Sequence, residues 1–331
     1  NYLSENYMDS VLILANKALS YDPQCAEAYY YRGYVYSETS KIDEALKEID
    51  KALKFNPNDW KAYYLRGSIF EAFSDYVGLI SNLYEAVLRN RGTGLPSFLI
   101  RFSYNISPLG FPDLGKKYNQ QALELNGDTT RYLFCLAWAE YCDENFEKAY
   151  QIAKSGNKRD STFRYLIRDP NIAIYSTMTG RSEEAYYLCL KFLNRLNKSG
   201  EIDPFISKTI AYYLWQTGRT KEAEFYFNQI IKFYQECIKL GRLGTIQKGA
   251  HFQLAEVYAF LGDKEKAYSY LDEVNKNQSF PLSRVISFKH EPFFNSIRRE
   301  PRFQAIVKDV EAKYQAEHER VRKWLVEQGM L

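Results

Sequence analysis

Apolar and polar positions repeat along this chain with a fixed step of 34 residues. Ala18, Ala52 and Ala86 occupy one register position, and Gly33 is followed by Gly67. The same step relates four further pairs, namely Pro23 and Pro57, Tyr29 and Tyr63, Arg32 and Arg66, and Tyr36 and Phe70. A period of this length predicts a unit of two helices that stacks on its neighbours to form a solenoid.

The clearest unit covers residues 26–59 and predicts two helices joined by a short turn. The first reads AEAYYYRGYVYSET and places Tyr29, Gly33 and Tyr36 on the face toward the second helix. Gly33 lets the two helices approach closely because it has no side chain. The second helix reads DEALKEIDKALKF, and Pro57 ends it. Its packing positions are Ala45, Ile49 and Ala52.

These residue types at this spacing resemble the tetratricopeptide repeat at its Trp/Tyr, Gly, Tyr, Ala, Ala and Pro positions. The resemblance implies an all-α fold, a right-handed superhelical solenoid of helix hairpins with a C-terminal capping helix. It also implies a binding or scaffolding role. Proteins of this class that clamp a terminal carboxylate use Lys and Asn at two groove positions, where this chain has Tyr30 and Tyr34.

The repeats predict one solenoid over residues 1–278, with about seven to eight helix pairs. The chain begins at Asn1 with what reads as the second helix of a repeat, so we expect a truncated first repeat and a fragment of a longer protein. Residues 91–129, rich in Gly and Pro at their start, predict a degenerate repeat with a long irregular turn. The signature then returns in looser form at Ala149, Ala185, Ala223 and Ala267.

Residues 279–331 predict an irregular, Pro-containing segment and then a capping helix from about Pro301 toward Glu327. The run HEPFFNSIRREPRFQAIV resembles the segment that closes tetratricopeptide regions in many multidomain bacterial proteins. The matching residues are Glu291, Pro292, Phe294, Ile297, Arg298, Glu300, Pro301, Arg302 and Phe303. In those proteins the repeats follow a helix-turn-helix DNA-binding domain, a cyclase or a kinase. The resemblance implies the sensory or partner-binding part of a larger bacterial regulator.

Net charge, the length of apolar runs and cysteine spacing argue against several classes of function. A net charge of +3 over 331 residues argues against direct nucleic-acid binding by this fragment. No apolar run approaches the length of a membrane span, so we expect no membrane insertion by this fragment. The five cysteines form no CxxC pair and predict free thiols. We expect a cytoplasmic or a periplasmic location, depending on what precedes Asn1.

Catalytic signals are weak throughout the sequence. The three histidines are far apart and form no metal-binding spacing. The segment RGTGLPS is too poor in Gly and Lys for a phosphate loop. We therefore predict no catalytic residue, no metal, no cofactor and no enzymatic activity.

The inner face of the solenoid is the strongest candidate for a binding site. The repeat register directs aromatic and charged side chains into the groove, and the predicted partner-binding residues are Tyr30, Tyr34, Lys61, Tyr64, Glu71, Arg131, Trp138, Tyr212 and Trp215. Several of these aromatic residues could instead pack against neighbouring helices or the C-terminal tail. The first hypothesis is a peptide or helix of a protein partner in this groove. The alternative is a small-ligand or glycan-sensing domain of a membrane-associated transcription regulator, and self-association remains open.

Overall fold

The structure is a computed structural model that describes residues 5–90, 92–156, 168–196, 204–240 and 244–331. All regular structure in these residues is helical. The helices of the first half are α1 (Glu5–Tyr21), α2 (Ala26–Glu38), α3 (Ile42–Phe55), α4 (Trp60–Ala72), α5 (Tyr76–Arg89), α6 (Leu95–Ile106), the 3-10 helix η1 (Ser107–Leu109), α7 (Pro112–Asn126) and α8 (Thr129–Cys142). Those of the second half are α9 (Phe146–Gly156), α10 (Arg168–Met178), α11 (Ser182–Leu196), α12 (Pro204–Gln216), α13 (Thr220–Lys239), α14 (Gly244–Leu261), α15 (Lys264–Asn275), α16 (Leu282–His290), the 3-10 helix η3 (Pro292–Phe294) and α17 (Pro301–Glu327).

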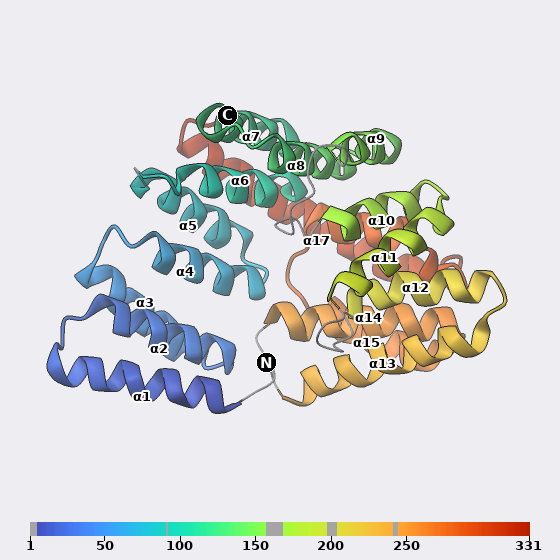
Figure 1. Ribbon diagram of the computed structural model, residues 1–331, viewed down its shortest axis with the longest axis horizontal. Coiled ribbons are helices and arrows are strands. Elements are labelled where there is room, and N and C mark those ends of the chain that lie inside the picture. The colour runs from blue at the N-terminus through green and yellow to red at the C-terminus, as the bar shows by residue number, and fades with distance from the viewer. Residues whose placement is uncertain (1–4, 91, 157–167, 197–203, 241–243) are drawn as a thin grey trace.

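Seven antiparallel helix pairs, from α2/α3 to α14/α15, follow one another along a curved path (Figure 1). The lone helix α1 packs on α2, as expected for the second helix of an earlier unit. The curvature brings α14 of the last pair back into contact with α4 of the second pair. The predicted all-α solenoid is thus confirmed, and its two halves enclose a common centre.

Close packing within a pair depends on small residues at the crossing point. A Cβ atom added at Gly33 would lie 2.8 Å from Ile49 Cγ1 and 3.2 Å from the Ala45 carbonyl oxygen. Ala45, Ile49 and Ala52 are fully buried in the same core. A larger side chain at Gly33 would therefore force α2 and α3 apart, as the sequence predicts.

The segment that predicts a degenerate repeat folds as the regular pair α6/α7. Pro96 lies in the first turn of α6, and η1 forms a short connection in place of the expected long turn. Gly110 ends this connection with a φ of 90°, a left-handed conformation that glycine adopts at no steric cost. Glycine and proline here start and stop helices, so they do not interrupt the solenoid.

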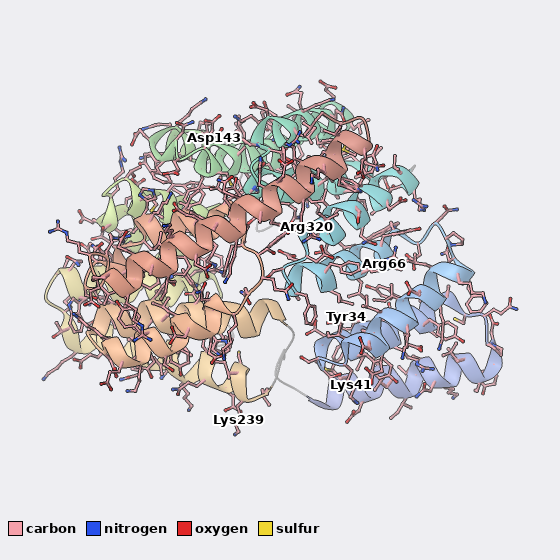
Figure 2. The ribbon with its side chains drawn as sticks, turned by 180° about the vertical axis from the view of Figure 1, so that it is seen from behind. Tyr34, Lys41, Arg66, Asp143, Lys239 and Arg320 are labelled. Carbon is pink, nitrogen blue, oxygen red and sulfur yellow. The ribbon has the colours of Figure 1, made fainter. Side chains whose placement is uncertain are left out.

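The C-terminal helix α17 covers the last pair and then continues across the molecule. Its first half places Phe303 and Val310 in the core formed by α14 and α15. Its second half places Val321 and Leu325 in the core formed by α5, α6 and α7. Figure 2 shows α17, which carries Arg320, crossing the face opposite to that seen in Figure 1. The capping helix begins and ends as predicted, but it also connects the last pair to the early ones.

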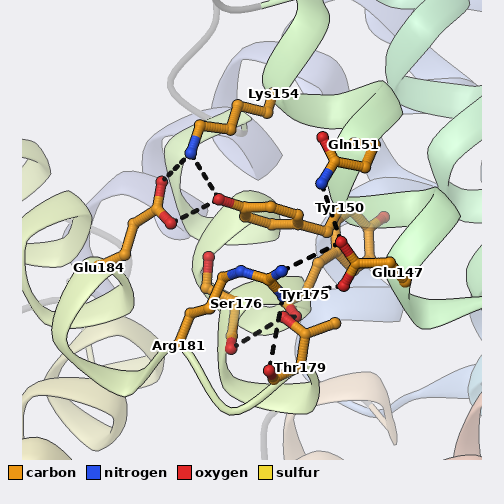
Figure 3. A network of polar contacts seen from close by, with 9 residues as sticks. All are labelled: Glu147, Tyr150, Gln151, Lys154, Tyr175, Ser176, Thr179, Arg181 and Glu184. Atoms are coloured by element: carbon orange, nitrogen blue, oxygen red, sulfur yellow. Dashed lines mark hydrogen bonds and ion pairs between the residues drawn. The ribbon is translucent and has the colours of Figure 1, made fainter.

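A polar cluster ties two successive pairs together (Figure 3). Tyr150 on α9 donates a hydrogen bond of 2.5 Å to Glu184 on α11, and Lys154 lies 2.6 Å from the Tyr150 hydroxyl. The Arg181 guanidinium lies 4.4 Å from the centre of the Tyr150 ring and donates hydrogen bonds of 2.9 and 3.0 Å to Glu147. Both carboxylate contacts join residues 34 positions apart, which is one repeat step. The cluster therefore holds neighbouring units in register.

Candidate functional site

The inner side of the curve is formed by the first helix of each pair. Three sets of successive first helices contact one another: α2 contacts α4, α6 contacts α8 and α10 contacts α12. Helices on the inner side of a curved stack lie closer together than those on the outer side. The predicted partner-binding residues belong to α2, α4, α8 and α12, so they lie on helices of this inner side. Their surroundings divide them into three groups.

The first group lies on α2 and α4 and contains three half-buried tyrosines, Tyr30, Tyr34 and Tyr64. Burial raises the pKa of Tyr30 to about 12, with smaller contributions from Tyr31, Asp59 and the other two tyrosines. Burial also raises the pKa of Tyr34. Tyr30 and Tyr34 pack on the core that α3 and α4 share, whereas Tyr64 packs on the core formed by α5, α6 and α7. The three side chains thus place aromatic surface on two successive repeats.

Two exposed cations border this aromatic surface. The Arg101 guanidinium on α6 donates a hydrogen bond of 2.7 Å to the Tyr64 hydroxyl and lies 4.3 Å from the centre of its ring. Lys61 lies 5.8 Å from the Trp60 ring. Neither side chain forms an ion pair with a carboxylate of the described residues. Tyr30, Tyr34, Lys61, Tyr64 and Arg101 are called the N-terminal surface below.

A cavity of about 390 Å³ adjoins the N-terminal surface between α2 and α4. Tyr30 and Lys61 line it together with Glu27, Asp59 and Trp60. Arg131, another predicted residue, is exposed on α8 and donates a hydrogen bond of 3.3 Å to Ser97 of the preceding pair. Its guanidinium also forms an ion pair with Asp128 at 3.6 Å, so its charge is already paired at the start of α8.

The second group, Glu71 and Trp138, lines a cavity at the centre of the curve that is partly open to solvent. The cavity has a volume of about 270 Å³ and is bounded by α4, α6, α8, the start of α14 and residues 274–284. Trp138 stacks on Tyr104 at 5.0 Å and donates a hydrogen bond of 2.9 Å to the Tyr104 carbonyl oxygen. Burial raises the pKa of Glu71. The central cavity is therefore lined by both aromatic and charged groups.

The third group, Tyr212 and Trp215 on α12, is packed against other parts of the chain. Tyr212 lies 5.4 Å from Phe293 of η3 and 5.6 Å from Phe260 of α14, measured between ring centres. Trp215 lies 5.7 Å from Phe260. Tyr212 and Trp215 therefore pack against neighbouring helices and the C-terminal tail, which is the alternative that the sequence left open.

A charged cluster lies beside η3 in the interior. Lys208 Nζ and Glu256 Oε2 are 2.5 Å apart, and both side chains are buried. Glu291 lies nearby, and burial raises its pKa to about 7, although Lys208, Arg284 and Arg298 oppose the rise. Sequence reasoning missed this cluster because its members come from α12, α14 and the C-terminal segment.

The raised pKa of Glu291 predicts a pH-dependent stability. Between about pH 5 and pH 7 the folded protein holds a proton on Glu291 that the unfolded chain has released, so raising the pH lowers the free energy of unfolding. We expect Glu291→Gln to flatten this decline and to stabilise the protein above pH 7. Urea denaturation across this range measures the slope. Glu224→Gln, at an exposed position, is the control, and an equal slope in all three proteins would contradict the prediction.

The three histidines contact different parts of the chain and do not share one site. His290 Nε2 lies 2.8 Å from Glu144, His318 Nδ1 lies 2.7 Å from the Leu109 carbonyl oxygen, and His251 packs beside Tyr270. Within the described ranges, no group of three or more His, Cys, Asp or Glu side chains is arranged to hold a metal ion. The same residues include no helix that is both long and apolar enough to cross a bilayer.

Family comparison identifies individual repeats. A protein-family model described as Tetratricopeptide repeat matches residues 26–59, which contain α2 and α3. A second family model with the same description matches two further segments. Residues 209–237 lie within α12 and α13, and residues 249–278 cover most of α14 and all of α15. No curated protein matches the sequence.

Solved structures share the fold at low sequence identity. The human IFIT1 dimer with m7Gppp-AAAA is 16% identical, with a TM-score of 0.51 over 97% of this chain and 77% of that one. The APC/C hetero-tetramer Cut9–Hcn1 is 15% identical, with a TM-score of 0.50 over 81% of this chain and 46% of that one. YrrB, described as a TPR protein with an unusual peptide-binding site, is 19% identical over 56% of this chain and 93% of its own, with a TM-score of 0.37. The 34-residue step, the stacked helix pairs and the matched repeats show that the chain is a tetratricopeptide-repeat protein.

Proposed function

We propose that the chain is a non-catalytic protein-interaction module that binds a segment of a partner protein on the N-terminal surface. The observation that supports this most is the set of three half-buried tyrosines beside two exposed cations that lack carboxylate partners among the described residues. Tyrosine supplies apolar area and a hydrogen-bonding hydroxyl at low entropic cost, and it is common at binding hot spots. Trp138, Tyr212 and Trp215 already contact the chain itself, so the site is centred on α2 and α4.

The partner segment is expected to be acidic, with apolar or aromatic anchors. Lys61 and Arg101 place positive charge beside the tyrosines. An acidic segment would pair with these cations, and its apolar side chains would pack on the rings. The cavity between α2 and α4 offers space for one anchor side chain beside Tyr30.

The test compares the parent protein with a Tyr30→Ala, Tyr34→Ala, Tyr64→Ala variant whose folding is verified by circular dichroism. Partners captured from cell extract, and then acidic peptides taken from their sequences, are titrated against both proteins. We expect the triple variant to lose at least about tenfold in affinity, because hot-spot truncations cost about 2 kcal/mol or more each. The affinity of the parent should fall with increasing salt, and Lys61→Gln with Arg101→Gln should reduce that dependence.

The matched control replaces three exposed aromatic residues outside the N-terminal surface, namely Tyr21, Tyr187 and Phe225, by alanine. This variant should bind like the parent. Equal capture by the parent and the Tyr30/Tyr34/Tyr64 variant would place the interaction on another surface and reject the proposal. Failure of the parent to capture any protein would favour the second candidate, a small-ligand or glycan-sensing domain.

The C-terminal run that resembles bacterial multidomain proteins supports a further part of the proposal. We place the chain in a larger regulatory protein, in which partner binding is transmitted to an output domain. In the structure Pro292 and Pro301 begin η3 and α17, and Phe294 and Phe303 are fully buried 5.1 Å apart, so the run forms a defined closing unit. The host protein and its compartment, cytoplasmic or periplasmic, follow from the sequence that adjoins this chain in its gene.

A further inference from the structure

The central cavity contains two opposite charges that the rest of the molecule does not neutralise directly. Glu71 extends from the last turn of α4, and Arg284 extends from α16. Among the described residues, no hydrogen-bond donor reaches the Glu71 carboxylate and no carboxylate lies within ion-pairing distance of the Arg284 guanidinium. Both side chains are half-buried, so their charged groups remain open to water or to a ligand in the cavity.

The surroundings of Arg284 hold it in place and leave its polar edge available. The guanidinium lies 3.8 Å from the centre of the Phe252 ring, a cation–π contact that uses its flat face. Glu256 and Glu291 act on Arg284 electrostatically from a greater distance, but Glu256 is bonded to Lys208 at 2.5 Å. The N–H groups of Arg284 therefore remain available for an anion that enters the cavity.

Other parts of the lining provide a negative group and flat apolar surfaces. Glu71 lies at the carboxyl end of α4, where the helix dipole also favours a positive ligand group. Tyr104 and Trp138, stacked 5.0 Å apart, form an aromatic wall between α6 and α8. Asn105 and Ser283 line the same space and supply neutral hydrogen-bonding groups.

We propose that the central cavity binds a small zwitterion, such as a free amino acid, with its carboxylate on Arg284 and its ammonium group on Glu71. The volume of about 270 Å³ is close to the lower end of the range for ligand pockets, about 300–1,000 Å³, which favours a small molecule over a folded or extended chain. A guanidinium recognises a carboxylate through paired hydrogen bonds, and a carboxylate recognises an ammonium group by charge. The site is separate from the N-terminal surface and does not depend on its partner.

Such a ligand would connect parts of the chain that are distant in sequence. Glu71 and Trp138 belong to the first half of the solenoid, whereas Arg284 belongs to the segment that follows the last pair. A ligand that contacts both sides stabilises the folded protein by binding only that state. Thermal unfolding therefore reports the binding of any compound that occupies the cavity.

The experiment titrates the complete chain with each standard amino acid and follows both the melting temperature and the heat of binding. We expect at least one amino acid to raise the melting temperature. Its N-acetyl derivative, which lacks the ammonium group, and its amide, which lacks the carboxylate, should each bind at least about tenfold more weakly. If no amino acid binds, or if both derivatives bind as well as the parent compound, the proposal is overturned.

Two variants assign the contacts. Arg284→Met keeps an apolar side chain on Phe252 and should bind the amino acid and its amide equally weakly, whereas Glu71→Gln should lose the preference for a free ammonium group. Without ligand Glu71→Gln should be at least as stable as the parent, because it loses an unpaired charge. Arg284→Met should be less stable, because Glu256 and Glu291 lose a nearby cation. Arg299→Met and Glu224→Gln, at exposed positions, are the controls and should bind like the parent. Unchanged selectivity in Arg284→Met and Glu71→Gln would overturn the assignment.

Discussion

Replacing Phe294 by alanine is expected to lower the free energy of unfolding by about 3–5 kcal/mol. Phe294 is fully buried where η3 meets α14, α16 and α17. Its ring centre lies 5.1 Å from Phe303, 5.6 Å from Phe252 and 5.7 Å from Phe288. Alanine would leave a cavity among three aromatic rings that belong to three different elements, and such a site cannot collapse easily.

Urea denaturation followed by circular dichroism measures this loss. Phe225→Ala is the control because Phe225 is 54% exposed on α13, and its replacement should change stability by no more than about 0.5 kcal/mol. A loss below about 1 kcal/mol for Phe294→Ala would show that the C-terminal segment packs less tightly than the distances indicate.

Replacing Lys208 by methionine is the second change with a large expected effect. Lys208 and Glu256 are 8% and 1% exposed, and Glu256 Oε1 has no hydrogen-bond partner among the described residues. Loss of the ammonium group leaves the Glu256 carboxylate buried without its cation, which costs about 3–5 kcal/mol. Glu291 lies close to both, so the uncompensated negative charge should also raise the pKa of Glu291 further.

A double-mutant cycle separates this penalty from lost packing. Lys208→Met combined with Glu256→Leu removes both charges and should recover most of the stability lost by the single change. Chemical denaturation of the parent, both single variants and the double variant supplies the four free energies. Strictly additive effects would mean that the pair is not coupled, contrary to the 2.5 Å contact.

The fold could be predicted from the sequence because each repeat encodes its own local packing. Gly33, Ala45 and Ala52 define a helix crossing within one unit, and the 34-residue step carries it to the next. The start of α17 follows from Pro301 and the apolar spacing after it. These signals involve residues that lie within a few helical turns of one another, so they can be recognised in the sequence itself.

The candidate site was only partly predictable from the sequence. The repeat register shows which face of the solenoid a residue lies on, but not which other segments of the chain pack against that face. Tyr30, Tyr34 and Tyr64 occupy half-buried positions on α2 and α4, the first helices of two successive pairs. Tyr212 and Trp215 occupy equivalent positions, but Phe260 and Phe293 pack against them. Arg284 could not be predicted because its segment has no repeat signature, and its position in the same cavity as Glu71 arises only when the solenoid curves back on itself.

The path of α17 changes how this solenoid is expected to fold. In an open array each unit contacts only its neighbours, so the ends can fray independently. Here the Tyr76 N–H donates a hydrogen bond of 3.0 Å to Glu317, 241 residues later, and Ser279 bonds to the carbonyl oxygen of Ser74. These contacts can form only after most of the chain is ordered, which raises the contact order and slows folding. The last helix thereby converts a linear array into a closed cooperative unit, in which loosening the end of the chain also loosens its early repeats.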